Sequence, residues 1–547
     1  MDYHQIQPAP SRLPTSMSQT SQVVASESKT EVDSIPAPST IEKEEVKDDI
    51  VSVEEPDRII VGWEEGEKEN PHNWSRLKRW YITIMASVLI LNATFASSAP
   101  SGIMAPLSKH FSLSHEVGVL TISLFVLGFA LGPLLWGPLS EHFGRKPIFI
   151  ISFTCYTLFQ VGNALARNTA SLLVFRLLGG IFAAAPIANS GALIGDIWDA
   201  KTRGKALAFF TLAPFAGPAI GPTISGFIAV SGVNWRWLFW LLTIFAGACL
   251  AGIIFTIPET YGPVLLRRKA ERLRRETNDP RYVAPTELGS VSFKERAKNV
   301  LLTPFTLFFH EPMLIAITAY ISFVYGTIYL LLQSYPIVFM RGHGMNAGIS
   351  GLMLLNLPVG GATGVAFYIL VMNRRYERAI QVHAPHPVPP EVRLEMLAVA
   401  APLFAISFFW FGWTSYPSIS FVSPLISGVV MGFSICLVFL GLTNYIVDAY
   451  LPVAASALAA MTFFRSLAGA GFPLFATQMY DALNPRWAST LLGLVAAVMV
   501  PLPFVLIKIG PRLRKNSKYA PSRPAPPKLA SPEKESTPDT SQAHIEV

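Results

Sequence analysis

The sequence predicts an all-α membrane protein with 12 transmembrane helices in two pseudo-symmetric six-helix bundles. Twelve long apolar stretches recur along the 547 residues, a basic polar loop separates the first six from the last six, and only 14% of residues are charged. A helix that crosses the hydrocarbon core needs about 20 mostly apolar residues. Because backbone polar groups in lipid need partners within their own segment, these stretches are helices and not strands.

The predicted spans set the domain boundaries. We expect an N-terminal bundle at 80–260, a cytoplasmic central loop at 261–304 and a C-terminal bundle at 305–510. The polar residues 1–79 and 511–547 bury too little apolar surface to offset the entropy cost of ordering, so we expect disordered cytoplasmic tails there. The twelve spans are 80–103, 117–138, 147–166, 172–195, 206–230, 236–257, 313–333, 349–372, 396–414, 421–443, 452–476 and 487–507.

Lys and Arg residues concentrate in alternate loops, which predicts the orientation. The positive-inside rule places these loops, the central loop and both termini in the cytoplasm. This orientation explains the net charge of +7, so we expect membrane lipid and no nucleic acid as a partner. The three cysteines lie inside predicted spans and show no metal-ligand spacing. We therefore expect no metal and no cofactor, with a proton gradient as the energy source. The basic residues are Arg145, Lys146, Lys201, Arg203, Lys205, Arg267, Arg268, Lys269, Arg272, Arg274, Arg275, Arg374, Arg375, Arg378, Arg512, Arg514 and Lys515.

The two halves show a faint internal repeat. Asp196 ends the fourth span and Asp448 ends the tenth, and Gly217-Pro218 falls at the same offset after Asp196 as Gly469-Ala470 after Asp448. Parallel repeats of this kind are typical of secondary transporters, in which two bundles rock about a site near the membrane midplane.

The loop between the second and third spans, residues 137–147, holds Glu141 and Arg145 among glycines. It resembles the cytoplasmic loop motif of the major facilitator superfamily, although that motif usually has Asp where Glu141 stands. The fourth span contains Arg176 and ends at Asp196, and it resembles the family's fourth-helix motif. The resemblance implies that Arg176 takes part in proton transfer and that Glu141, Arg145 and Asp196 form a charge network that latches the outward-facing state. Arg176 lies about 7 Å below the outer interface at helical rise, so snorkelling is the alternative.

The fifth span repeats proline every four residues, and two glycines adjoin the prolines. Each proline removes a helix hydrogen bond, and the glycines permit close packing. The run resembles the antiporter motif of drug-exporting facilitators, with Pro222 in place of the last glycine; a structural kink is the alternative. Further matches at 70–74, 235–237, 258–261 and 389–394 extend the resemblance to the fungal 12-helix drug:proton antiporters. The motif residues are Pro214, Gly217, Pro218, Gly221 and Pro222.

Arg465 is the deepest charge in the predicted spans, and a charge at this depth is a functional candidate. The seventh span adds Tyr325, Tyr329 and Gln333 at four-residue spacing, and Asn356 and Asn444 are similar polar residues within spans. We expect these residues to line the substrate cavity; ordinary helix packing is the alternative. No Asp, Glu or His lies deep in a predicted span, so proton coupling depends on Glu141, Asp196 and Asp448.

The function that we expect is proton-coupled export of small amphipathic organic molecules (drugs, toxins or a secondary metabolite). We expect a multi-pass protein of the plasma membrane that acts as a monomer. A facilitator or importer of a sugar, polyamine or organic acid is the alternative, and a nutrient receptor that no longer transports is another. An enzyme is not expected, because we find no Ser-His-Asp arrangement, no His-rich metal motif and no phosphate-binding loop.

Overall fold

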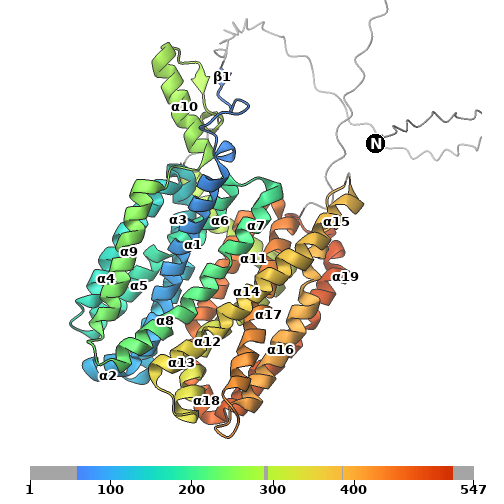
Figure 1. Ribbon diagram of the computed structural model, residues 1–547. Coiled ribbons are helices and arrows are strands. Elements are labelled where there is room, and N and C mark those ends of the chain that lie inside the picture. The colour runs from blue at the N-terminus through green and yellow to red at the C-terminus, as the bar shows by residue number, and fades with distance from the viewer. Residues whose placement is uncertain (1–57, 289–292, 385, 521–547) are drawn as a thin grey trace, which may run out of the picture. The chain divides into compact units, whose positions relative to one another are not determined.

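The computed structural model describes residues 58–288, 293–384 and 386–520, and the described part is built almost entirely of helices (Figure 1). The N-terminal half and the segment after it contain α1 (Arg76–Ser98), α2 (Met104–Phe111), α3 (His115–Phe143), α4 (Arg145–Ala164), α5 (Thr169–Ala183), α6 (Ala185–Ile197), α7 (Ala200–Phe210), α8 (Leu212–Val230), α9 (Arg236–Thr256), α10 (Gly262–Thr277) and α11 (Phe293–His310).

The C-terminal half repeats this pattern of long helices and short connections. Its helices are α12 (Pro312–Tyr335), α13 (Ala347–Met353), α14 (Asn356–Phe367), α15 (Asn373–His383), α16 (Leu397–Thr414), α17 (Val422–Ala449), α18 (Ala454–Met499) and α19 (Pro501–Asn516). Short 3-10 or π segments connect or extend these helices at 71–73, 99–103, 285–287, 336–342, 368–372, 390–394 and 451–453.

The described residues contain 11 helical segments that are long and apolar enough to cross a membrane, and the last of them, Leu451–Asn516, is 66 residues long. At 1.5 Å per residue a straight helix of this length would span about 100 Å, far more than a bilayer of about 30 Å. The segment is broken at Asn484, which has φ 60° and ψ 157°. The Tyr480 hydroxyl lies 3.0 Å from the Ser489 hydroxyl, so the chain reverses there and crosses twice. The predicted all-α membrane fold with twelve spans is confirmed.

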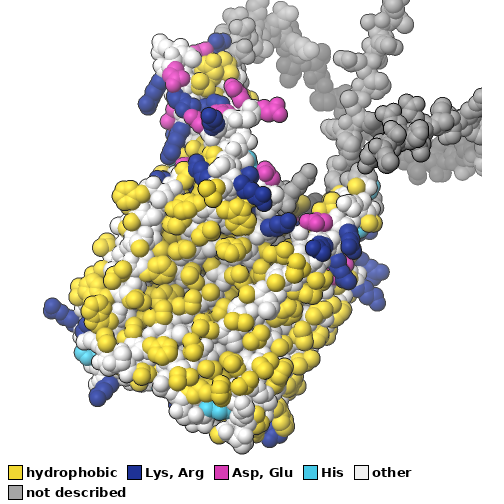
Figure 2. Space-filling view, viewed as in Figure 1, with side chains coloured by type: hydrophobic (Ala, Val, Ile, Leu, Met, Phe, Trp, Pro, Cys, Tyr) yellow, Lys and Arg dark blue, Asp and Glu magenta, His cyan; other side chains and the backbone are white. Residues whose placement is uncertain are grey.

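We name the two ends of the helical bundle by the helix connections that lie there. The basic end is where α3 meets α4 and from which α10 extends, and the distal end is where α4 meets α5 and where α18 breaks (Figure 1). Figure 2 shows a broad apolar surface over the helices, with most of the visible Lys and Arg side chains at the basic end. This distribution is what a membrane-embedded bundle with one positively charged end requires.

Residues 58–79, which we expected within the disordered tail, fold against the central loop. Strand β1 (Ile59–Ile60) pairs in parallel with β2 (Tyr282–Val283), and Val61 packs with Ala270 and Ala284 in a small separate core. We call residues 58–75, which precede α1, the strap. Helix α1 then starts at Arg76 because Ser75 caps it, its hydroxyl accepting the Lys78 backbone N–H. Residues 1–57 lie outside the described residues.

Ion pairs fasten the strap to α10 and neutralise part of the positive charge of this helix. Lys269 lies 2.8 Å from Glu67, and Arg272 forms a bidentate contact with Glu69 at 2.8 and 3.1 Å.

At the other end of the chain, α19 continues into the predicted C-terminal tail as far as Asn516. Residues 521–547 lie outside the described residues.

The two halves are hydrogen-bonded to each other toward the distal end. The His115 ring lies 2.9 Å from the Thr477 hydroxyl, and the Gln478 amide donates to Glu116 at 3.3 Å. The Thr223 hydroxyl donates to the Gly351 carbonyl at 2.9 Å. These contacts hold α3 against α18 and α8 against α13, so the bundle is closed at its distal end.

Candidate functional site

A charge cluster occupies the basic end of the N-terminal half, where α4 begins. Arg145 is buried, and its Nε donates to Asp196 at 3.3 Å while a second nitrogen donates to the Ser140 hydroxyl at 2.6 Å. Its guanidinium also lies over the Tyr261 ring, 4.7 Å from the ring centre. The predicted pairing of Arg145 with Asp196 is therefore present in the structure.

Glu259, which follows α9, is the second carboxylate of this cluster. It accepts the backbone N–H groups of Arg145 at 2.9 Å and of Lys146 at 3.2 Å, and so caps the N-terminus of α4, where anions are favoured. Sequence reasoning noted residues 258–261 as a family match but gave Glu259 no role. The side chain of Glu141, which we expected in the cluster, makes no ion pair or hydrogen bond with another described residue. Glu259 takes its place because it reaches the helix terminus, whereas Glu141 lies within the last turn of α3.

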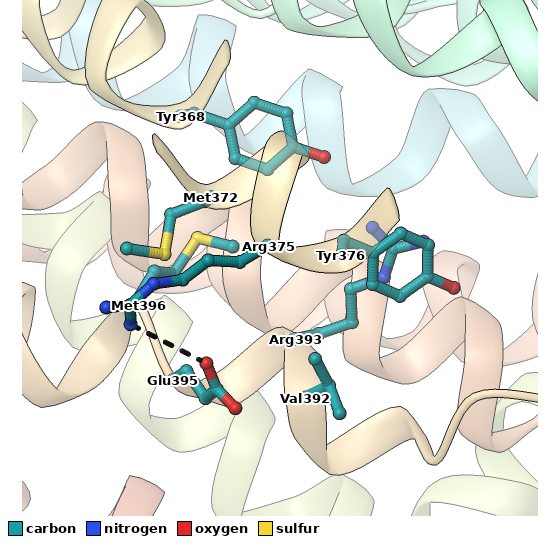
Figure 3. A pocket seen from close by; sticks show the side chains of 8 residues that line it. All are labelled: Tyr368, Met372, Arg375, Tyr376, Val392, Arg393, Glu395 and Met396. Carbon is teal, nitrogen blue, oxygen red and sulfur yellow. Dashed lines mark ion pairs between the residues drawn. The ribbon is translucent and has the colours of Figure 1, made fainter. Parts of the chain in front are cut away.

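The C-terminal half holds an equivalent pair. Arg393, just before α16, donates from Nε to Asp448 at the end of α17 with a distance of 2.8 Å. Its guanidinium stacks over Tyr376, 3.4 Å from the ring centre. Figure 3 shows Arg393 and Tyr376 beside a small pocket, with Arg375 and Glu395 paired along another part of its wall. Asp448 was predicted, but its partner Arg393 was not.

The two pairs occupy equivalent positions in the internal repeat. Arg145 begins the third span and pairs with the end of the fourth, and Arg393 begins the ninth and pairs with the end of the tenth. The third charged group has the opposite sign in the two halves. In the N-terminal half it is the Glu259 carboxylate, which follows the sixth span and contacts the start of the third. In the C-terminal half it is Arg514 of α19, which pairs with Glu391 at the start of the ninth span at 2.7 Å. Each half therefore fastens its own helices at the basic end.

Arg176 does not lie beside any carboxylate of this cluster. It is fully buried in α5, and its guanidinium donates to the backbone carbonyls of Thr121 at 2.6 Å, Ala96 at 2.9 Å and Ser97 at 3.1 Å. It also lies over the Phe125 ring, 4.1 Å from the centre. Snorkelling is therefore not what the structure shows. Arg176 joins α1, α3 and α5, and these contacts give it a structural task; the proton-transfer role implied by the resemblance stays a prediction.

Helix α8 uses the glycines and prolines of the predicted antiporter motif to lie between α1 and α13. A Cβ atom on Gly217 would overlap Thr94, and one on Gly221 would overlap Ser98, so both glycines permit the close approach to α1. Pro218 and Pro222 lie within the helix beside them, and Pro214 lies in its first turn. The Pro222 carbonyl faces Gly351 of α13, where a Cβ atom would also overlap it. The motif thus forms part of the contact between the halves.

A cluster of aromatic and polar side chains lies deeper, where the halves meet. The Tyr329 hydroxyl lies 3.0 Å from the Ser97 hydroxyl and 3.4 Å from that of Tyr325. The Arg465 guanidinium lies over the Tyr325 ring, 5.1 Å from its centre. The structure therefore brings together three of the residues that we predicted to line the cavity, Tyr325, Tyr329 and Arg465.

The other predicted cavity residues have different surroundings. Asn356 is buried and tied to the Tyr335 hydroxyl at 2.9 Å and to the Leu425 carbonyl at 3.0 Å, so its amide joins helices of the C-terminal half. Gln333 is buried one turn beyond Tyr329, and its amide nitrogen has no partner in the described part of the chain. Asn444 is half-buried on α17, near the basic end.

Comparison with known proteins agrees with this geometry. The family model described as Major Facilitator Superfamily matches residues 86–473. The major facilitator superfamily multidrug transporter mdrA of Aspergillus fumigatus is 41% identical over 85% of this chain and 76% of that protein. The efflux pump FUBT of Fusarium oxysporum is 40% identical over 83% of this chain and 76% of its own length. Polyamine transporter 3 of Saccharomyces cerevisiae is 37% identical over 84% and 73%.

Solved structures show the same fold at much lower sequence identity. The partially occluded inward open conformation of the xylose transporter XylE from E. coli aligns with a TM-score of 0.57 and 19% identity. The alignment covers 79% of this chain and 98% of that one. The shared features are the helical architecture and the two-bundle arrangement.

Proposed function

Because the chain belongs to the major facilitator superfamily, and is thus a multi-pass membrane transporter and not an enzyme, we propose that it exports small amphipathic organic molecules in exchange for protons. The cargo class comprises drugs, toxins or a secondary metabolite. The observation that supports export best is the identity of about 40% over most of the chain with proteins named as a multidrug transporter and an efflux pump.

The packing of α8 supports the same direction. Its glycines and prolines lie where α1 of one half and α13 of the other approach, so this helix touches both lobes. The prolines each remove a helix hydrogen bond, so α8 bends more easily at this contact as the lobes rearrange. We therefore assign the motif to the closure of the distal end, which precedes loading from the basic end.

Proton coupling is supported by the two equivalent ion pairs. Protonating Asp196 or Asp448 would remove its attraction for the paired arginine, and a carboxylate that loses its cationic partner holds a proton more tightly. Because this pair lies within one lobe, a rearrangement inside the lobe that separates Arg145 from Asp196 as the lobes rock would couple proton uptake to conformation. The ion pairs lie at the basic end, which we place in the cytoplasm.

With the basic end in the cytoplasm, the closed distal end makes this a state closed toward the cell exterior. Because Arg145 and Asp196 are paired in this state, their contact alone does not latch the outward-facing state, contrary to what the family resemblance implies. The contacts at the distal end are made between the halves, whereas the ion pairs of the basic end are made within each half. We place the transporter in the plasma membrane as a monomer, with both termini in the cytoplasm and lipid around its apolar surface.

The test uses inside-out vesicles from cells that produce the full chain, with one anionic, one neutral and one cationic amphipathic fluorescent dye. Proton-coupled export predicts accumulation of at least one dye when the vesicle interior is acid, and loss of that accumulation when an ionophore dissipates the pH gradient. Empty-vector vesicles are the control. Accumulation that ignores the gradient would leave an uncoupled facilitator, and movement only in right-side-out vesicles would make the protein an importer.

A further inference from the structure

Arg465 is a deep charge that has no charged or hydrogen-bonded side-chain partner among the described residues. It lies about 17 Å along α18 from Ala454, and in the described part of the chain no carboxylate pairs with it and its Nε atom is buried without a hydrogen-bond partner. Its neighbours are two rings, Tyr325 at 5.1 Å and Phe439 at 5.5 Å from the ring centres. An unpaired cation at this depth is costly unless something else compensates it.

Arg176 shows what a satisfied deep arginine looks like in the same bundle. All three of its guanidinium nitrogens donate to backbone carbonyls, and the side chain is fully buried. Arg465 is only half-buried although it lies deep in its helix, so its side chain keeps some accessible surface there. A purely structural role therefore explains Arg176 but does not explain Arg465.

The surroundings of Arg465 come from both halves, which is where a transported molecule must bind. Tyr329 joins the cluster to Ser97 of α1, and Phe439 packs edge-on against Phe215 of α8 at 5.4 Å between ring centres. On the next turn of α18, Gly469 faces Tyr325 and Val126 of α3. The cluster thus combines one cation, phenolic hydroxyls and aromatic faces at the interface of the lobes.

We propose that Arg465, with the hydroxyls of Tyr325 and Tyr329, binds the carboxylate of an aromatic or amphipathic organic acid. The guanidinium offers several N–H donors to a carboxylate, and the rings of Tyr325 and Phe439 offer apolar faces to the rest of the molecule. A cationic cargo would meet Arg465 as a like charge with no carboxylate paired to it to offset the repulsion. This inference rests on the proposed function and narrows its cargo to organic anions.

The test measures equilibrium binding to the purified full-length protein in detergent, so it is independent of transport. The probes are aryl carboxylates of two sizes, benzoate and 2-naphthoate. Each is compared with its neutral amide and with the cation in which a CH2–NH3+ group replaces the carboxylate. We expect the carboxylate to bind roughly ten- to a hundredfold tighter than the amide, as for a hydrogen bond to a charged group. In Arg465→Gln that preference should fall to about one, and Arg465→Lys should keep part of it.

Arg486→Gln is the matched control, because Arg486 stacks on Trp413 at the distal end, far from the cluster. It should leave the preference unchanged, and equal melting temperatures would show that Arg465→Gln is folded. Equal binding of acid and amide, failure of both carboxylates to bind, or an unchanged preference in Arg465→Gln would each overturn the inference. Dye export that persists in vesicles while any of these is observed would leave the proposed function standing.

Discussion

The Arg393 guanidinium holds the Asp448 carboxylate at 2.8 Å, in the C-terminal counterpart of the contact that Arg145 makes with Asp196 at 3.3 Å. The two arginines begin equivalent spans, and the two aspartates end equivalent spans. The repeated contact shows that each lobe fastens the start of one span to the end of the next in the same way, although the third charged group has opposite sign in each.

We predict that Asp196→Asn and Asp448→Asn each abolish pH-gradient-driven export while the protein still reaches the membrane. The amide keeps the size of the side chain but removes the charge that pairs with arginine and the proton that it could take up. The measurement is dye accumulation in inside-out vesicles with an acid interior. Asp199→Asn is the control, because Asp199 is exposed and contacts Arg79 at 3.4 Å outside the cluster. Normal coupled export in both variants would remove these carboxylates from the mechanism.

Arg176→Ala is expected to destabilise the protein by about 3 kcal/mol or more, because it removes three hydrogen bonds from the buried guanidinium to backbone carbonyls of α1 and α3. Thermal unfolding in detergent, followed with wild type alongside, measures this effect. Arg486→Ala, at the distal end, should change the melting temperature little. A variant with unchanged stability but no proton-driven export would instead assign Arg176 to proton transfer.

Gly221→Ala should cost about 1–3 kcal/mol of stability and slow transport, because the added methyl group would overlap Ser98 of α1. Gly247→Ala on α9 is the matched control, since a Cβ atom there meets nothing within 4 Å. Both effects are measured on the same preparations, as melting temperature and as initial rate of dye uptake. If the two variants behaved alike, the close approach of α8 to α1 would have no mechanical importance.

The strap is expected to detach from α10 as the pH falls. Hydrogen bonds from Arg272 of α10 lower the pKa of Glu69 in the strap. A carboxylate with a lowered pKa in the folded state stabilises that state fully above its ordinary pKa, and this contribution is lost as pH falls through the lowered value. The contacts should therefore be intact at neutral pH and weaken below the ordinary range of Glu.

Hydrogen exchange of the strap tests this prediction, with rates corrected for the intrinsic effect of pH. The Ile59 and Val61 amides, which donate to the Arg281 and Val283 carbonyls at 2.9 Å, should be protected at pH 7 and exchange faster in acid. Glu69→Gln should lower their protection already at pH 7. Glu271→Gln should not, because Glu271 pairs with Arg267 within α10. Equal protection in both variants would show that the β1–β2 pairing alone holds the strap.

The sequence was sufficient where the information is local. Apolar runs of about 20 residues identified the spans, and even the merged final segment was predicted as two spans, on either side of the break at Asn484. The placement of Asp196 and Asp448 at equivalent helix ends was visible from the repeat. The spacing of glycines and prolines in α8 indicated close packing, since four-residue spacing places them on one helix face.

Partners far apart in the chain were decided by the tertiary structure. Glu259 caps α4 from 114 residues away, in the position that we had assigned to Glu141. Residues 59 and 282 pair as strands, although two-residue strands leave no periodic pattern in the sequence. A deep arginine can have hydrogen-bond partners, as Arg176 has, or lack them among the described residues, as Arg465 does. Which of the two occurs depends on the carbonyls and rings that surround it. Hydropathy records the cost of burying each charge, and only the packing of the helices determines which groups compensate that cost.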